Sequence, residues 1–148
     1  SKSRSMAGMR IGYAMGNEQL IKYLNDVKYS FNSYTMNRTA IEMGIASVTD
    51  KDYFEDTVEK IKATRAWTGK ELKKLGFTFQ DSKANFIFAS HESVSAQEIF
   101  QALRQAHIYV RYFNRPRIDN YLRITIGTQE EMEKLIAFLE KYLQNIDD

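Results

Sequence analysis

The sequence has no cysteine, a single proline and only seven glycines in 148 residues. The absence of cysteine excludes a disulfide framework and any thiolate metal site, and it is typical of a reducing compartment. Disordered and linker-rich proteins contain more proline and glycine than this sequence does, so its composition indicates neither class. With 43% hydrophobic residues, the chain is long enough to fold around one compact core.

An excess of one charge and long apolar runs are also missing. The formal net charge is +2, so electrostatics attract the protein only weakly to nucleic acid or an acidic membrane. No apolar run approaches the roughly 20 residues of a membrane-spanning helix, and the sequence shows no signal-peptide pattern. His91 and His107 have no companions at metal-ligand spacing. We therefore expect a cytoplasmic protein without a nucleic-acid, membrane or metal partner.

The first fourteen residues carry the strongest functional pattern, Ser-Lys-Ser-Arg-Ser-Met-Ala-Gly-Met-Arg-Ile-Gly-Tyr-Ala. Lys2 offers a primary amine that can form a Schiff base when its surroundings keep it deprotonated. Arg10 offers a planar guanidinium that binds a phosphate through two parallel hydrogen bonds. Gly8 permits a tight chain reversal that would bring Arg10 back beside Lys2. The segment therefore predicts an amine and a phosphate-binding group in one site.

This segment resembles the lysine region of the fold-type I pyridoxal-phosphate aminotransferases. In that region Ser-Lys is followed by a short spacer, a small residue, Gly and then x-Arg-x-Gly-Tyr. In that family the lysine binds the cofactor covalently, and the preceding serine and the following arginine hold the cofactor phosphate. The resemblance implies that Lys2 is catalytic and that Ser1, Lys2 and Arg10 bind pyridoxal 5'-phosphate. The alternative is an ordinary basic terminus followed by a hairpin that contains glycine.

Two more arginines fall on predicted strands, Arg111 at the end of one and Arg123 inside another. An arginine beside a largely buried sheet needs an anionic partner such as Asp119 or a glutamate, or it must reach water along its aliphatic stem. Residues 121–128, Tyr-Leu-Arg-Ile-Thr-Ile-Gly-Thr, also resemble the C-terminal signature of the same family, in which the arginine binds the substrate α-carboxylate. Arg111 resembles the position that binds the substrate phosphate in the histidinol-phosphate branch.

Hydrophobic spacing and capping residues predict alternating helices and strands. Helices are expected to begin after Asn17, Asn37, Asp50, Ser95 and Thr128, and strands are expected over residues 11–15, 84–89, 108–111 and 121–126. Gly76 is expected to end the long helix after Asp50, and residues 28–36 are expected to form a connector. The pattern predicts an α+β fold with strands in one layer and helices packed on the other side.

The family resemblance covers essentially the whole chain and is weakest over residues 28–37. It implies the small domain of a fold-type I transferase, with a mixed or antiparallel sheet, over residues 37–148. Residues 1–36 would be the tail of the large cofactor domain and a connector. The implied parent is a homodimeric enzyme that transaminates histidinol phosphate, with 2-oxoglutarate and glutamate as the exchange pair.

The implied large domain would supply groups that contact the cofactor ring and that have no counterpart in this sequence. We therefore expect the chain by itself to be inactive and to retain no cofactor. Two alternatives stay open. One is a sister activity, either an aromatic amino-acid aminotransferase or a threonine-phosphate decarboxylase. The other is a free-standing α+β binding module without catalysis.

Overall fold

The computed structural model describes residues 2–147, with the backbone alone described at Asp147. The chain forms two compact units, Ser1–Asp56 and Thr57–Asp148. The division falls within helix α3 (Lys51–Lys74), later than the division expected after residue 36. Helix α2 (Arg38–Thr49) belongs with the first unit because Arg4 Nη1 donates a hydrogen bond to the Ser47 carbonyl at 2.9 Å. The division of a longer protein into domains at residue 36 stays a prediction.

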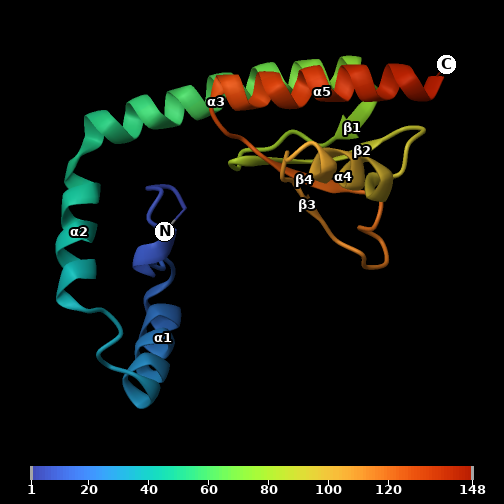
Figure 1. The fold of residues 1–148 in the computed structure, drawn as a ribbon. Coiled ribbons are helices and arrows are strands. Elements are labelled where there is room, and N and C mark those ends of the chain that lie inside the picture. Colours follow the sequence, from blue (N-terminus) through green and yellow to red (C-terminus); the bar gives the residue numbers. More distant parts are fainter. Residues whose placement is uncertain (1, 148) are drawn as a thin grey trace. The chain divides into compact units, whose positions relative to one another are not determined.

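The first unit contains a 3-10 turn, η1 (Ala7–Met9), helix α1 (Glu18–Phe31) and helix α2 (Figure 1). Helix α1 begins after Asn17, whose side chain accepts a hydrogen bond from the Gln19 amide at 2.9 Å. Asn37 caps α2 in the same way, accepting from the Ala40 amide at 2.7 Å. Each cap satisfies an amide that has no partner inside its helix, and both helix starts agree with the sequence prediction.

Two predictions for this unit are wrong. Residues 11–15 form no strand, because a strand needs a hydrogen-bonded neighbour and the described residues of this unit contain no other strand. Residues 28–31 belong to α1 rather than to a connector. Apolar side chains at Leu24, Val27 and Phe31 continue the helical spacing through the last turn, and the Asn32 amide donates to the Lys28 carbonyl at 2.8 Å.

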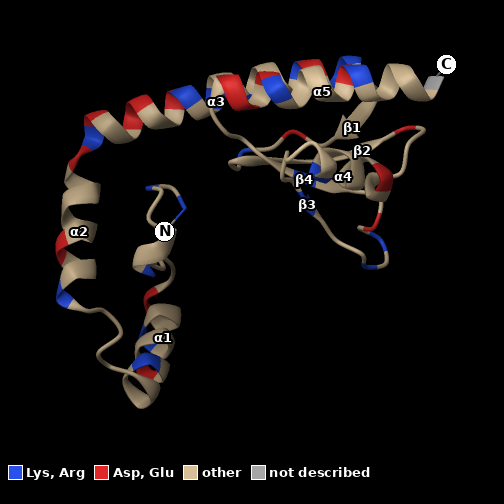
Figure 2. Ribbon diagram, in the orientation of Figure 1, with Lys and Arg blue, Asp and Glu red and all other residues tan. Residues whose placement is uncertain are grey.

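Helix α3 begins after Asp50, whose carboxylate accepts a hydrogen bond from the Tyr53 amide at 3.1 Å. Charges of both signs occur along α3 (Figure 2), and the Lys74 ammonium lies 2.7 Å from the Glu71 carboxylate. The helix ends before Gly76, as predicted. Gly76 has φ +78°, a conformation that is strained for any residue with a Cβ.

The second unit contains a four-stranded sheet in the order β1-β2-β4-β3, in which every neighbouring pair is antiparallel. Its strands are β1 (Phe77–Phe79), β2 (Phe86–His91), β3 (Arg111–Tyr112) and β4 (Leu122–Thr125). The strands expected at 84–89 and 121–126 correspond to β2 and β4. The strand expected at 108–111 starts later because the Ile108 amide donates to the Leu103 carbonyl at the end of a helix, at 2.9 Å. Strand β1 was not predicted.

Two helices of this unit begin at reciprocal caps. Helix α4 (Ala96–Gln105) has a capping box in which the Ser95 hydroxyl accepts from the Glu98 amide and the Glu98 carboxylate accepts from the Ser95 amide. Helix α5 (Gln129–Asp147) begins with the same exchange between Thr128 and Glu131. Both starts were predicted from the spacing of these residues.

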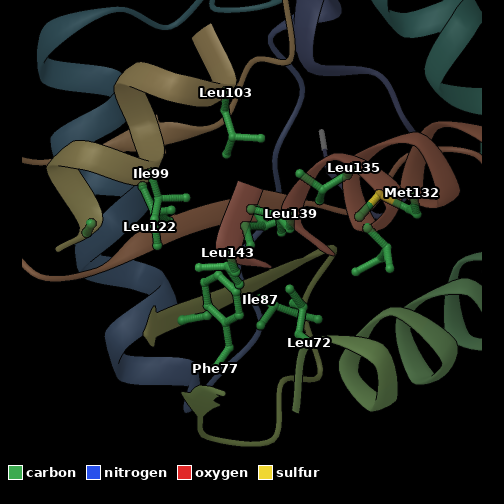
Figure 3. Packing of buried hydrophobic residues seen from close by; sticks show 14 of the residues in the cluster. Leu72, Phe77, Ile87, Ile99, Leu103, Leu122, Met132, Leu135, Leu139 and Leu143 are labelled. Atoms are coloured by element: carbon green, nitrogen blue, oxygen red, sulfur yellow. The ribbon is translucent and has the colours of Figure 1, made fainter. Parts of the chain in front are cut away.

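The core of the second unit lies between the sheet and its helices. Figure 3 shows side chains of α3, α4 and α5, including Leu72, Ile99 and Leu139, gathered around those of the strands, including Ile87 and Leu122. The largest of these side chains are almost completely buried. Burying each such aliphatic side chain stabilises the fold by about 1.5–3 kcal/mol. The observed architecture is the predicted α+β fold.

The two faces of the sheet differ in chemistry. The register places Ile87 opposite Ile124 and Ala89 opposite Leu122, and all four side chains are buried in the core. Because side chains alternate along a strand, the residues between them lie on the second face. That face carries Phe86, Phe88, Arg111 and Arg123.

Candidate functional site

The N-terminal segment holds Lys2 and Arg10 in irregular backbone. Lys2 is exposed, and its carbonyl accepts a hydrogen bond from the Ser5 amide at 3.2 Å. Arg10 follows η1 with φ +56° and ψ +33°, in the left-handed region. Residues other than glycine seldom adopt this left-handed conformation, and those that do concentrate at functional sites. Ser1, the third residue of the predicted cofactor site, lies outside the described residues.

The guanidinium of Arg10 is largely free to bind a ligand. Its Nη1 donates a hydrogen bond to the Ala7 carbonyl at 3.0 Å, across the 3-10 turn. An arginine has five N–H donors, and the others make no hydrogen bond or ion pair with the described residues. The turn therefore orients Arg10 and leaves most of its donors available to an anion.

Arg4 fixes this segment in place, a role that was not predicted from the sequence. Its Nη1 donates to the Ser47 carbonyl near the end of α2, and its guanidinium lies 3.7 Å from the centroid of the Phe54 ring. A cation at the C-terminal end of a helix interacts favourably with the helix dipole. The hydrogen-bond partner is a backbone carbonyl far along the chain, so no sequence motif indicates this contact.

Arg111 and Arg123 are brought together by the sheet. They are direct cross-strand partners on β3 and β4, and Arg123 is in turn opposite Phe88 on β2. Side chains of such partners have Cβ atoms about 4.5–5.5 Å apart, and two like charges at that spacing destabilise the sheet. An anion bound by both arginines would remove this repulsion.

No ion pair joins Arg111 or Arg123 to a carboxylate among the described residues, so the predicted alternative of a bond to Asp119 or a glutamate is not formed there. One aromatic ring lies beside each guanidinium group instead. The Arg123 guanidinium lies 4.4 Å from the centroid of the Phe86 ring, and that of Arg111 lies 5.1 Å from the Phe113 ring.

The Nε atom of Arg123 is buried and has no hydrogen-bond partner among the described residues. A buried donor without a partner costs about 1–3 kcal/mol, more for a charged group. Native proteins keep such a group mainly where a ligand, ion or water satisfies it. With Arg111 opposite, the second face can bind an anionic group such as a phosphate or a carboxylate.

Other candidate groups have structural roles. His91 is buried, with Nε2 at 2.8 Å from the Leu75 carbonyl and Nδ1 accepting from the Val94 amide at 3.1 Å. Within residues 2–147 no cluster of three or more histidine, aspartate or glutamate side chains could hold a metal ion. In the same part of the chain, no helix is both long and apolar enough to cross a membrane.

Known proteins resemble the chain over nearly its whole length. It is 50% identical to the histidinol-phosphate aminotransferase of Brachyspira hyodysenteriae over 145 residues, which is 98% of this chain and 41% of that protein. It is also 50% identical to the enzyme of the same name from Lactococcus lactis over 148 residues, again 41% of that protein. The chain therefore spans less than half the length of these relatives.

Solved structures agree with the sequence matches. The crystal structure of histidinol-phosphate aminotransferase from Sinorhizobium meliloti in complex with pyridoxal-5'-phosphate has a TM-score of 0.82 at 25% identity, covering 99% of this chain and 40% of that one. The enzyme from Clostridium acetobutylicum has a TM-score of 0.84 at 26% identity. Residues 1–139 match the family described as aminotransferase class I and II. The chain belongs to the aminotransferase class I and II family.

Proposed function

We propose that this chain supplies the cofactor-binding lysine and the substrate-binding arginines of a histidinol-phosphate aminotransferase. The reaction is the transamination of histidinol phosphate with 2-oxoglutarate and glutamate as the exchange pair, in histidine biosynthesis. The observation that carries the proposal is the cross-strand pair of Arg111 and Arg123, with the buried Nε of Arg123 unsatisfied within the described residues. Relatives that share half of its residues are histidinol-phosphate aminotransferases.

The residues of the N-terminal segment fit pyridoxal phosphate by their chemistry. Lys2 offers an exposed amine for the cofactor aldehyde, and Arg10 offers a guanidinium with free donors for its phosphate. We assign Ser1 to the phosphate as well, on the family pattern. The bound cofactor would withdraw electrons from the substrate α-carbon. Lys2 Nζ would then take up and return the proton at that carbon.

Arg123 and Arg111 would orient the substrate. Arg123 would bind the α-carboxylate of glutamate or, in histidinol phosphate, which has no carboxylate, the phosphate, through the two parallel hydrogen bonds that a guanidinium offers. Arg111 would bind the phosphate, which only the phosphorylated substrate carries. Two guanidinium groups fixed beside one phosphate restrict its position and so lower the entropy cost of reaching the reactive geometry.

The rest of the enzyme must come from residues beyond the 41% of the relatives' length that the chain matches. We therefore assign the activity to the full-length protein, and expect it to act as a cytoplasmic homodimer, as the family pattern implies. Size-exclusion chromatography with light scattering tests the dimer.

The first prediction concerns Arg111 and Arg123 in the full-length enzyme. Arg123→Ala should lower kcat/KM for histidinol phosphate and for glutamate alike. Losing a desolvated charge-assisted contact costs about 2–5 kcal/mol, a decrease of about 30-fold to several thousand-fold. Arg111→Ala should lower kcat/KM for histidinol phosphate by about tenfold or more and lower the value for glutamate less, because glutamate has no phosphate.

Arg104→Ala is the matched control, because Arg104 is an exposed arginine on α4. It should behave like the wild-type enzyme. Equal losses for both substrates in the Arg111 variant would contradict a phosphate site and favour an aromatic amino-acid aminotransferase. Release of carbon dioxide in place of amino transfer would favour the decarboxylase.

A further inference from the structure

A groove lined mainly by cationic side chains lies between helix α3 and the segment that joins β1 to β2. Its volume is about 470 Å³, and all of its residues belong to the second unit. Its charged side chains are five cations and a single carboxylate: Lys62, Arg65, Lys70, Lys73, Lys83 and Asp81. The whole chain has a formal net charge of only +2. Positive charge is therefore concentrated in this groove.

The sequence of α3 explains both the shape and the charge of the groove. Two adjoining rows at four-residue spacing line it, with Lys62, Ala66 and Lys70 in one and Arg65, Gly69 and Lys73 in the other. Four residues make slightly more than one helical turn, so the members of a row lie side by side. Each row has a small residue between two cations, which leaves a hollow with a positive rim. At a rise of about 1.5 Å per residue, the rim is about 16 Å long.

Contacts that involve no carboxylate hold the two walls of the groove together. Arg65 Nη1 donates a hydrogen bond to the Ala84 carbonyl at 2.7 Å, which ties α3 to the segment before β2. A Cβ atom at Gly69 would meet the Phe79 ring at 3.4 Å, so glycine lets α3 approach β1 closely. The Lys73 ammonium lies 5.3 Å from the centroid of the same ring. These contacts fix the groove without neutralising its charge.

Most of the cations in the groove have no ion-pair partner. Lys62 is the exception, with its ammonium 2.6 Å from the Glu59 carboxylate. The other four form no ion pair with a carboxylate of the described residues: Arg65, Lys70, Lys73 and Lys83. A cleft lined by charges of one sign raises the local concentration of ions of the opposite sign. The groove therefore favours an anionic ligand.

The groove lies on the opposite face of the sheet from Arg111 and Arg123. Phe79 is the cross-strand partner of Ala89, which is buried on the core face. Arg123 is opposite Phe88, the neighbour of Ala89 in the chain, and so lies on the second face. A ligand in the groove would not occupy the proposed substrate site.

We propose that this groove binds a small anion that carries two or more linked phosphate groups, such as inorganic pyrophosphate or a nucleoside diphosphate. Linked phosphates offer oxygens to several cations at once, which suits a rim longer than one anionic group. Nucleic acid fits less well, because the groove has one aromatic ring for stacking and the cations do not continue as a basic stripe over the nearly neutral chain. The inference goes beyond the proposed function and does not depend on it.

The test titrates the full-length protein with sodium pyrophosphate by isothermal titration calorimetry, without divalent cations. The double variant Lys70→Gln/Lys83→Gln should raise Kd by about five- to thirtyfold, the combined effect of two exposed charge pairs. The matched control is Lys134→Gln/Lys141→Gln, which removes the same charge from exposed lysines of α5 that do not line the groove. It should bind like the wild type.

Asp81→Asn provides a test in the opposite direction. It removes the one carboxylate of the groove and should lower Kd for pyrophosphate by about two- to fivefold. Its control is Glu140→Gln, at an exposed position on α5. Titration with ADP distinguishes the two sources of linked phosphates. Tighter binding of ADP than of pyrophosphate would support a nucleotide, and weaker binding would support the inorganic anion.

Two outcomes would overturn the inference. Equal weakening in the groove variant and the control lysine variant would show that pyrophosphate responds only to the net charge of the protein. Loss of binding in Arg123→Ala, with the groove variant unchanged, would place the anion on the other face of the sheet. Neither outcome affects the proposed function, which is tested by the kinetics of the arginine variants.

Discussion

His91 joins the end of one helix to the start of another through its ring. The Val94 amide donates to Nδ1, so the ring proton must be on Nε2, which donates to the Leu75 carbonyl. The ring also meets Phe77 edge to face, with centroids 4.9 Å apart. This residue therefore links the turn after α3 to the segment that leads into α4.

His91→Ala should lower the free energy of unfolding of this polypeptide by about 2–4 kcal/mol, because it leaves buried polar groups without partners and opens a cavity. Urea titration followed by circular dichroism measures the change. His107→Asn is the control, since His107 is exposed with φ +60° and asparagine tolerates that conformation. Equal stability of the two variants would mean that the His91 hydrogen bonds contribute nothing measurable.

The capping boxes decide where two helices of the second unit begin. At α4, the Ser95 hydroxyl lies 3.3 Å from the Glu98 amide, and the Glu98 carboxylate lies 3.2 Å from the Ser95 amide. Both amides lack partners within the helix. The cap also sets the position of Ile99 and Leu103, which pack into the core.

Ser95→Ala should reduce the unfolding free energy by about 1 kcal/mol, the usual effect of removing an N-cap acceptor. Ser95→Thr keeps a hydroxyl that can both accept from the Glu98 amide and donate to the Glu98 carboxylate, as the Ser95 hydroxyl does at 2.6 Å, and should retain most of the stability. Thermal unfolding of both variants gives the comparison. If Ser95→Thr lost as much as Ser95→Ala, the role of the cap would be disproved.

Local chemistry was enough to predict most elements of the fold. Each helix start is specified by a short stretch of sequence, because the side chain of one residue caps the helix. These capping residues are Asn17, Asn37, Asp50, Ser95 and Thr128. Elements that depend on distant partners were missed or misplaced. Strand β1 has three residues, too few for a period, and it pairs with β2. Residues 11–15 have strand-like composition but no strand beside them in the described part of their unit.

The same distinction applies to the candidate site. Arg111 and Arg123 were predicted from the sequence to bind substrate because each lies in or beside a recognisable motif, and that role stays a prediction. Their direct pairing was not predicted, because it depends on the register of β3 against β4. Phe86 is far from Arg123 in the chain, so no spacing rule indicates their contact, whereas Phe113 lies two residues after Arg111, the spacing that places side chains on one face of an extended segment.

The two units of the molecule differ in how much they bury. Among the described residues of the first unit, Ala40 alone is buried, and α1 buries no side chain. Phe31, at the end of α1, is 92% exposed. The second unit has the continuous core described above. Local stability follows buried apolar contacts, so the first unit should open more readily.

Hydrogen exchange of this polypeptide, followed by mass spectrometry, should show the difference. Amides of α1 and α2 should exchange at least about 100-fold faster than those of β2, β4 and α5, a gap of about 2.7 kcal/mol in opening free energy. The central strands serve as the internal reference. Equal protection in both units would show that the first unit is stabilised by contacts that its burial does not reveal.

The order of the sheet leaves β1 and β3 at its edges, with three and two residues respectively. Exposed edge strands are templates on which a second chain can add, and natural proteins limit that risk with short, charged or proline-flanked edges. Strand β3 begins with Arg111 and is followed by Arg115, Pro116 and Arg117, which include the one proline of the sequence. The longer strands β2 and β4 are both interior. The sheet is therefore protected against fibril growth at its edges, and the charged edge that provides this protection also carries a proposed substrate arginine.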